Sequence, residues 1–306
     1  MKIGSKINSG KKLRDTIKEK GIAVLPGVID AHSARLVEMA GFDGVYITSF
    51  GLHASMLASN DIDLLTTTEM VDQSRRIAHA VNIPAMVDGE SGGMNIEGTI
   101  REFRLYEEAG IGAIQFDDEL KPCKCPFLRP DQKQQLVSIE EMCKKIEAAV
   151  ATRKNKDTLI VARSDTYGSV YDDGTTSHLD EQIKRLNAYA KAGADVIFPI
   201  ATKFEDYCRV ANAVDAPYKV VCLSDMDCQV PDYELHKYSV EDWKNAGFNI
   251  YIVPLLSLQA SGKAIEAALT KFKETGLQPI DMFMRQDYYN KILRMTEVDE
   301  LGLNNF

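Results

Sequence analysis

The sequence has little that would tie it to a membrane, a nucleic acid or an export route. It contains no uninterrupted apolar run of the roughly 18 residues that a membrane-spanning helix requires. Its formal net charge is −9, whereas phosphate backbones bind to basic surfaces, so we expect no nucleic-acid partner. Residues 1–12 lack the apolar stretch of a secretory signal peptide, which favours a cytoplasmic protein without a membrane partner.

The six cysteines do not form a recognisable framework. Cys143, Cys208 and Cys222 fall within helical or apolar patterns, where cysteine acts as a small buried hydrophobe. Cys123 and Cys125 lie in a polar segment, but their spacing is not the two-pair pattern of a structural zinc site. A disulfide scaffold is not expected in a large chain of cytoplasmic appearance.

What is present is an alternation of short apolar segments with amphipathic ones. Strands are predicted at 22–26, 44–48, 85–87, 113–116, 159–162, 195–199, 218–222 and 250–253. Helices are predicted at 31–40, 68–80, 96–109, 138–151, 178–191, 203–213, 240–245 and 257–275. Such alternation indicates parallel strands joined by crossover helices, and eight repeats are the count of a closed (β/α)8 TIM-type barrel.

The two ends of the chain fall outside this repeat. Residues 8–20 are polar and helix-prone, which predicts an N-terminal cover helix, and residues 276–306 are predicted to be a helical tail. We therefore expect one domain over 1–306. The polar segment 120–137 is long for a connection inside a compact domain, and such segments are either functional or disordered.

Charged side chains follow three of the predicted strands. Asp88 and Glu90 end the strand at 85–87, and residues i and i+2 of an extended backbone point the same way. Two carboxylates there suit a hard cation such as Mg²⁺. The alternative is a solvated strand-to-helix loop that carries Asp and Glu by chance. Because Asp117 and Arg163 end two other strands, and a barrel gathers these ends on one rim, we favour a site.

Jointly, several short motifs resemble those of the isocitrate lyase and phosphoenolpyruvate mutase superfamily. They are PGVIDAHSA at 26–34, SFG at 49–51, DGE at 88–90, DD at 117–118 and ARSD at 162–165. The resemblance covers the chain from about residue 10 to about residue 290. It implies a modified βα barrel whose eighth helix is swapped between protomers, with homotetramers built as dimers of dimers. It also implies Mg²⁺, with Mn²⁺ as a substitute, and small 2-oxo or 2-hydroxy carboxylate substrates that react through an enolate.

The same resemblance assigns metal ligands. Asp88 matches the metal-binding aspartate; Glu90 stands where the family usually has aspartate, and Asp117 where it usually has glutamate. Asp61 resembles the aspartate that holds metal-bound water.

Substrate contacts are implied as well. Arg163 matches the arginine that binds a substrate carboxylate, with a structural ion pair to Asp165 or Asp117 as the alternative. The backbone around Ser49, Gly51 and Leu52 matches the carboxylate cradle. His53 follows that cradle, and either a site role or a capping or surface role is open to it.

The segment after residue 117 bears on the type of reaction. Lyases of the superfamily carry Lys-Arg-Cys-Gly-His there, and Cys125 falls at the position of the acid–base cysteine, although Pro126 and Phe127 replace the Gly and His. A catalytic role for Cys123 is the alternative. Mutases carry Glu-Asp-Lys and a later asparagine, whereas this chain has an acid, Glu119, in place of the lysine and no asparagine over 119–137.

These features favour a carbon–carbon lyase. The alternatives are mutase, phosphonopyruvate hydrolase or oxaloacetate decarboxylase chemistry on the same metal site, and a barrel that binds a carboxylate without turnover. Ile200 replaces a glutamate of the lyases, and Leu223, Ser224 and Asp225 replace residues that hold a larger polycarboxylate. The implied substrate is therefore smaller or less charged than isocitrate or methylisocitrate.

Overall fold

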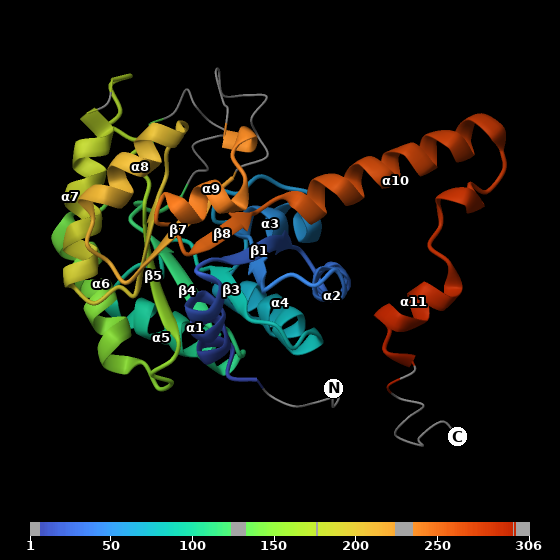
Figure 1. Cartoon of the computed structure of the whole chain (residues 1–306), viewed down its shortest axis with the longest axis horizontal. Coiled ribbons are helices and arrows are strands. Elements are labelled where there is room, and N and C mark those ends of the chain that lie inside the picture. Colours follow the sequence, from blue (N-terminus) through green and yellow to red (C-terminus); the bar gives the residue numbers. More distant parts are fainter. Residues whose placement is uncertain (1–6, 124–132, 176, 224–234, 296, 298–306) are drawn as a thin grey trace.

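The sheet is a closed barrel of eight parallel strands (Figure 1). A computed structural model describes residues 7–123, 133–175, 177–223, 235–295 and 297. The strands are β1 (Ala23–Val28), β2 (Val45–Ile47), β3 (Ala85–Asp88), β4 (Ala113–Asp117), β5 (Leu159–Ser164), β6 (Val196–Pro199), β7 (Tyr218–Cys222) and β8 (Ile250–Val253). Each strand pairs with the next in the chain, and β8 pairs with β1. The predicted (β/α)8 fold is confirmed.

Helices cover the outside of this barrel (Figure 1). They are α2 (Ala31–Met39), α4 (Thr67–Ala80), α5 (Ile96–Glu108), α6 (Ile139–Thr152), α7 (Ser177–Lys191), α8 (Phe204–Ala213) and α9 (Val240–Asn245). The helix after β8, α10 (Leu256–Thr275), does not cover the barrel. Several begin at a side-chain cap: Asp30 and Thr66 form capping boxes at α2 and α4, which satisfy backbone N–H groups that have no partner inside the helix. The structure adds α3 (Ser49–Leu57), where the sequence pattern predicts only the end of a strand and a loop.

The hydrophobic core has two layers. The larger cluster fills the space between the strands and the surrounding helices, and the smaller one fills the barrel interior. Helix α1 (Ser9–Lys20) contributes Leu13 and Ile17 to the interior cluster. The Ser9 hydroxyl accepts the N–H of Ala85, the first residue of β3, at 2.9 Å, so α1 closes the amino-terminal end of the barrel. This confirms the predicted cover helix and leaves the carboxyl ends of the strands as the barrel mouth.

Side chains alternate between these two layers along every strand, as a pleated backbone requires. The inward-facing apolar residues are Ala23, Leu25, Tyr46, Met86, Ala113, Leu159, Val161, Val196, Phe198, Val220, Ile250 and Ile252. By the same alternation, Asp88, Asp117 and Arg163 also face inward, each at the last inward position of its strand. The three sequence-predicted rim residues are therefore brought together by strand register, which pairs Asp117 with Arg163.

The C-terminal segment leaves the barrel and returns. Figure 1 shows α10 projecting away from the body, with the later helix α11 (Gln286–Ile292) lying back near α2. The Nε of Arg35 on α2 donates to the carbonyl of Ile292 at 3.2 Å, and the rings of His32 and Tyr289 lie 5.8 Å apart. A helical tail over the described part of 276–306 is confirmed, and none of the residues of α10 is buried.

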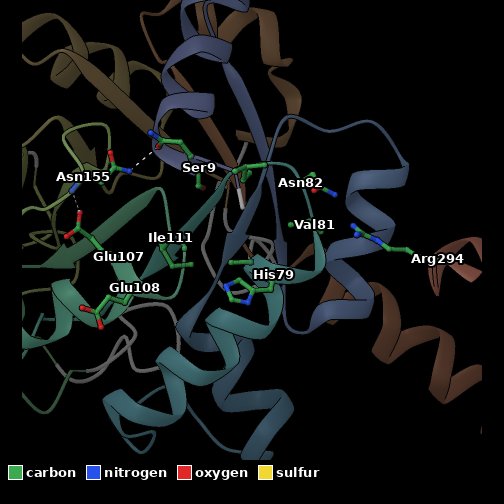
Figure 2. Close-up of a pocket in the computed structure, with 13 residues that line it drawn as sticks. Ser9, His79, Val81, Asn82, Glu107, Glu108, Ile111, Asn155 and Arg294 are labelled. Carbon is green, nitrogen blue, oxygen red and sulfur yellow. Dashed lines mark hydrogen bonds between the residues drawn. The ribbon is translucent and has the colours of Figure 1, made fainter. Parts of the chain in front are cut away.

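A cavity of about 310 Å³ lies at the amino-terminal end (Figure 2). Its walls include Ser9 of α1, Asn82 before β3, Ile111 before β4 and Asn155 before β5, with Arg294 from the tail. It is therefore at the opposite end of the barrel from the acidic rim. Within the described residues, no helix combines the length and the apolar character that crossing a membrane would need.

Candidate active site

A chain of polar side chains crosses the mouth from β2 to β4. The hydroxyl of Tyr46 lies 3.2 Å from Oδ2 of Asp88 and 2.9 Å from Oε1 of Gln115, and Nε2 of Gln115 donates to Oδ1 of Asp117 at 2.9 Å. All four side chains are buried. Sequence reasoning did not single out Tyr46 or Gln115. The available signal was their polarity at inward positions of otherwise apolar strands.

Asp88 is the centre of the candidate site. Its Oδ1 accepts the N–H of Glu90 at 3.1 Å, and its Oδ2 accepts the hydroxyl of Ser49 at 3.1 Å. The same hydroxyl lies 3.1 Å from Oδ2 of Asp61. Asp88, Ser49 and Asp61, which come from three separate stretches of sequence, are thus in direct contact.

Glu90 lies beside Asp88 through a backbone conformation that the sequence did not predict. The strand ends at Asp88, and Glu90 has a φ of +52°, so the expected extended i, i+2 arrangement is wrong. The physical reason is a tight turn: the N–H of Gly89 donates to the carbonyl of Gln115 at 3.0 Å, and the N–H of Gly92 to the carbonyl of Gly89 at 3.2 Å. The carbonyl of Glu90 in turn accepts the N–H of Asp117 at 2.8 Å.

The carboxylate of Glu90 is buried and incompletely satisfied. Its Oε1 has no hydrogen-bond partner among the described residues, and its Oε2 lies 3.8 Å from Nζ of Lys121. Burial raises the pKa of Glu90 well above its ordinary value, and the charge of Asp61 raises it further. An acceptor oxygen left without a donor in a buried position is a feature that a bound cation would satisfy.

Arg163 lies across the mouth from these carboxylates. Its Nε and Nη2 donate to Oδ1 of Asp165 at 3.0 and 2.7 Å, which is one of the structural ion pairs considered as the alternative role. Its Nη1 lies 3.8 Å from Asp88 and 3.7 Å from Asp117, and its guanidinium carbon is 5.4 Å from the ring centre of Phe198. Asp165 therefore fixes one edge of the guanidinium while the other edge faces the site.

Burial dominates the electrostatics of this group. It raises the pKa of Asp117 well above the usual range, with Arg163 opposing the rise. It raises the pKa of Asp165 to about 6, again against the effect of Arg163. It raises the pKa of Asp61 to about 6, with the charge of Asp88 adding to the rise. Carboxyl groups gathered in this way are costly to ionise together, and a bound cation would lower that cost.

His53 lies fully buried behind Asp61. Its Nδ1 is 3.0 Å from the carbonyl of Ser49 and 3.1 Å from Oδ1 of Asp61, and its Nε2 accepts the backbone N–H groups of Leu64 and Leu65, both at 3.1 Å. An Nε2 that accepts two N–H groups carries no proton, so Nδ1 carries it and the ring is neutral. His53 is therefore not a surface residue: it contacts Asp61 from behind and holds the backbone of Leu64 and Leu65.

His53, Asp61 and Glu90 form a group of described residues close enough together to hold a metal ion, with ligand atoms within 4.8 Å of one another. Because both ring nitrogens of His53 already have protein partners, a metal there would break those hydrogen bonds. Carboxylate oxygens have two lone pairs each, so Asp61, Glu90 and nearby Asp88 can bind a metal and keep the hydrogen bonds described above. The donor set is therefore one of carboxylates, which suits a hard cation such as Mg²⁺.

The proposed carboxylate cradle is the first turn of α3. Thr48 is its N-cap, and Ser49, Gly51 and Leu52 are buried. The N–H of Leu52 donates to the carbonyl of Thr48 at 3.0 Å, so the N–H groups of Ser49 and of the residue that follows it are those without a partner inside the helix. A Cβ on Gly51 would lie 2.6 Å from the methyl of Thr48, which explains the glycine. Helix N-termini of this kind attract anions.

The start of the segment after β4 closes one side of the site. Lys121 donates from Nζ to Oδ1 of Asp63 at 2.9 Å, and the N–H of Cys123 donates to Oδ2 of the same carboxylate. Cys123 is buried, and burial raises the pKa of its thiol far above the usual range, with Glu119 adding to the rise. Cys125, the predicted acid–base residue, lies outside the described residues, as do Pro126, Phe127, Ser224 and Asp225.

A closed βα barrel with carboxylates, an arginine and a free helix N-terminus at its mouth defines an enzyme of the TIM-barrel class with an acidic active site. The chain belongs to the phosphoenolpyruvate phosphomutase family, whose profile matches residues 13–273. This confirms the superfamily indicated by the motifs.

Similarity to individual relatives extends over nearly the whole chain. It is 33% identical to 2,3-dimethylmalate lyase of Eubacterium barkeri, over 97% of this chain and 98% of that protein. It is 35% identical to 2-methylisocitrate lyase of Aeropyrum pernix, over 92% of this chain and 87% of the relative. Among solved structures, phosphoenolpyruvate phosphomutase from Streptomyces platensis subsp. rosaceus matches with a TM-score of 0.84 and 27% identity, over 95% and 97% of the two chains.

Proposed function

We propose that this protein is a Mg²⁺-dependent carbon–carbon lyase that acts on a small 2-hydroxy or 2-oxo dicarboxylate. The observation that carries the proposal is the arrangement at the mouth: Nη1 of Arg163, on the edge of the guanidinium that Asp165 does not hold, lies 3.8 Å from Asp88 and 3.7 Å from Asp117. One side of the mouth thus suits a cation and the other a carboxylate. The full-length similarity to two lyases supports the reaction type.

The metal ligands that we propose are Asp88, Glu90 and Asp117, with Asp61 acting through bound water. All four are carboxylates whose side chains converge on the same end of the barrel. Bound Mg²⁺, or Mn²⁺ on the same oxygen donors, would supply positive charge that stabilises negative charge developing on substrate oxygens. His53 keeps Asp61 in place, and the turn after β3 keeps Glu90 in place.

The substrate carboxylates are assigned to Arg163 and to the cradle of Ser49, Gly51 and Leu52. Asp165 holds Nε and Nη2 of the arginine, so the guanidinium keeps its planar fork in one orientation without reorganising when substrate arrives. In the first turn of α3, the N–H of Leu52 donates to the carbonyl of Thr48 and the N–H of Gly51 faces the Thr48 hydroxyl. The backbone donors left for the other carboxylate are therefore the N–H groups of Ser49 and Phe50, and Gly51 and Leu52 shape the turn that presents them.

Cleavage also needs a proton donor. When the bond between C2 and C3 of a 2-hydroxy diacid breaks, the hydroxyl proton passes to a base and C2 becomes an oxo carbon. The electron pair of the broken bond stays on C3 as an enolate with the carboxylate attached to it, and C3 then takes one proton, so no proton is gained or lost overall. We assign that last proton to Cys125 on the segment after β4, with Cys123 as the alternative. Closure of that segment would exclude water from the enolate.

A product screen tests the proposal. Protein with Mg²⁺ is incubated with substituted malates, oxaloacetate, methylisocitrate and phosphonopyruvate, and products are followed by NMR. We expect an oxo acid and a second carboxylate, lost in Asp88→Asn together with Mg²⁺-induced thermal stabilisation. Asp180→Asn, at an exposed acid on α7, is the matched control and keeps both. Full turnover in excess chelator would overturn the metal-dependent reaction.

The family profile keeps phosphomutase chemistry as a second candidate. Pyruvate with phosphate from phosphonopyruvate would place the protein with the hydrolases, conversion of phosphonopyruvate to phosphoenolpyruvate with the mutases, and pyruvate with CO₂ from oxaloacetate with the decarboxylases. Binding with Mg²⁺ but no product from any compound would favour the non-catalytic barrel.

We also propose that the chain is a single domain over 1–306 and assembles as a homotetramer, a dimer of dimers. The support is α10: it carries Ile265, Leu269 and Phe272, all exposed, on a helix with no buried residue. An apolar face of this kind is a common interface. Light scattering that gives the mass of one chain would refute the assembly. Cytoplasmic location stays a prediction from the sequence.

A further inference from the structure

The turn after β3, residues 89–93, carries Glu90 into the site on an unusual backbone. Glu90, Gly92 and Gly93 have φ values of +52°, +65° and +78°, all in the left-handed region. Every residue of the turn except Glu90 is buried. Its backbone carbonyls therefore need hydrogen-bond donors from the protein, since water cannot replace them.

Three of the five carbonyls of this turn have donors close by. The carbonyl of Gly89 accepts the N–H of Gly92 at 3.2 Å, and the carbonyl of Glu90 accepts the N–H of Asp117 at 2.8 Å. The hydroxyl of Thr99, in the first turns of α5, donates to the carbonyl of Gly92. The turn itself, β4 and α5 thus account for these three carbonyls.

Lys145 on α6 supplies the donor for the other two. Its Nζ donates to the carbonyl of Ser91 at 2.9 Å and to the carbonyl of Gly93 at 3.3 Å. No other described group donates to these two carbonyls. Lys145 is only 3% exposed, so a helix outside the barrel reaches the turn with a fully enclosed ammonium group.

An enclosed ammonium group is costly unless its partners compensate for the lost hydration. Both hydrogen bonds of Lys145 to described residues go to backbone carbonyls, and neither goes to a carboxylate. Burial lowers the pKa of Lys145 below its ordinary value, with the charge of Glu141 opposing the fall. A methionine would fill a similar space without this cost, so the two carbonyls account for a lysine at this position.

Without Lys145, the carbonyls of Ser91 and Gly93 would both be buried and unsatisfied. The turn could relieve this only by rotating those peptide units, because no second donor is near. Ser91 directly follows Glu90, so the rotation would also move the Glu90 side chain. The N–H of Glu90 donates to Oδ1 of Asp88 at 3.1 Å, and the same movement would disturb that contact.

We propose that Lys145 is a positioning residue that anchors the turn after β3 from outside the barrel and so holds Glu90 in place for the metal ion. This inference rests on the proposed metal site and adds a residue to it. Lys145 acts through the backbone of Ser91 and Gly93. It touches neither the metal nor the substrate and takes no part in proton transfer.

The test is the dissociation constant for Mg²⁺, measured by calorimetry on the metal-free protein well below its Tm. Lys145→Met should raise this constant about tenfold or more, as is typical when a group that orients a metal ligand is removed. The matched control is Lys144→Met, one residue away, where an exposed lysine pairs with Glu140 and the constant should not change. An unchanged constant in Lys145→Met would overturn the proposal.

A second control separates positioning from loss of stability. Arg153→Met, just after α6 at the amino-terminal end of the barrel, breaks an ion pair to Asp195 of 2.6 Å. It should lower Tm and leave Mg²⁺ affinity unchanged. If it weakens Mg²⁺ binding as much as Lys145→Met does, positioning is refuted. Should Lys145→Met fail to fold, Lys145→Gln, whose amide donor lies on a side chain one bond shorter, replaces it with the same expectation.

The outcome also distinguishes this proposal from the proposed function. If the wild-type protein binds no Mg²⁺, the metal site fails, and the anchor is then followed by hydrogen–deuterium exchange at the amides of Gly92 and Asp117. Both amides donate to carbonyls of the turn. Faster exchange in Lys145→Met than in Arg153→Met would uphold the anchor. Equal exchange in the two variants would overturn it.

Discussion

Replacing Arg185 by methionine should destabilise the protein strongly, although Arg185 does not touch the proposed substrate site. Arg185 and Asp118 are a buried ion pair, with 2% and 0% of their side chains exposed. Oδ2 of Asp118 accepts Nη1 of Arg185 at 3.1 Å and the hydroxyls of Ser164 and Tyr189, both at 2.8 Å. The pair joins the end of β4 to α7 and to the end of β5.

The magnitude follows from burial. Removing one partner leaves the other charge in a low-dielectric site, which costs about 3–5 kcal/mol. At about 2.1 cal/mol/K of unfolding entropy per residue, 306 residues give about 0.64 kcal/mol/K, so Tm should fall by about 5–8 °C. Asp118 keeps its two hydroxyl donors in the variant, so we expect the fall in Tm to lie toward the lower end of this range.

The assay is thermal unfolding at one fixed protein concentration, because the Tm of a protein that assembles depends on its concentration. The control is Arg209→Met, which removes an ion pair to Asp180 whose two side chains are 43% and 71% exposed. Exposed pairs contribute about 0–1 kcal/mol, so the control should lower Tm by about 1 °C. A fall in Arg185→Met no larger than in the control would refute the view that the pair is desolvated and structurally important.

Two further changes follow from the site. Burial raises the pKa of Asp61 to about 6 from an ordinary 3.8, so between these values the folded protein binds the extra proton and Asp61's contribution to stability falls as pH rises. A cation that binds Asp61 must displace that proton, so the Mg²⁺-induced rise in Tm should be smaller near pH 5 than near pH 7.5. Equal rises at the two pH values in a thermal-shift titration would contradict this prediction. Gly92→Ala should lower the free energy of unfolding in urea by about 1–3 kcal/mol. Gly92 has a φ of +65°, and a Cβ at this position would lie 2.5 Å from the ring of Phe116. An unchanged urea midpoint would contradict this and would show that the turn relaxes.

The sequence predicted the fold because its signal is periodic. Each strand is a short apolar run followed by an amphipathic helix, and closure of eight such units needs no further information. Helix α3 was missed for a physical reason: residues 49–57 are mostly apolar or small, so no polar face marks a helix. Its first turn is set by the cap at Thr48, which looks like an ordinary strand end in the sequence.

The candidate site was only partly predictable. Asp88, Asp117 and Arg163 were recognisable because they end strands, and a barrel places those ends together. Glu90 lies beside Asp88 and Asp61, as the sequence led us to expect, but the extended geometry that we predicted is wrong. The turn after Asp88 depends on a hydrogen bond to the neighbouring strand. The contact between His53 and Asp61 depends on α3 and the segment that follows it, so no local pattern could reveal it.

Along β4 and β5, the inward-facing residues change from apolar at the amino-terminal end to polar or charged at the carboxyl end. On β4 the inward residues run from Ala113 through Gln115 to Asp117, and on β5 from Leu159 through Val161 to Arg163. The apolar residues nearer α1 are packed in the interior cluster, which provides the rigidity that buried charges at the other end need in order to stay close together.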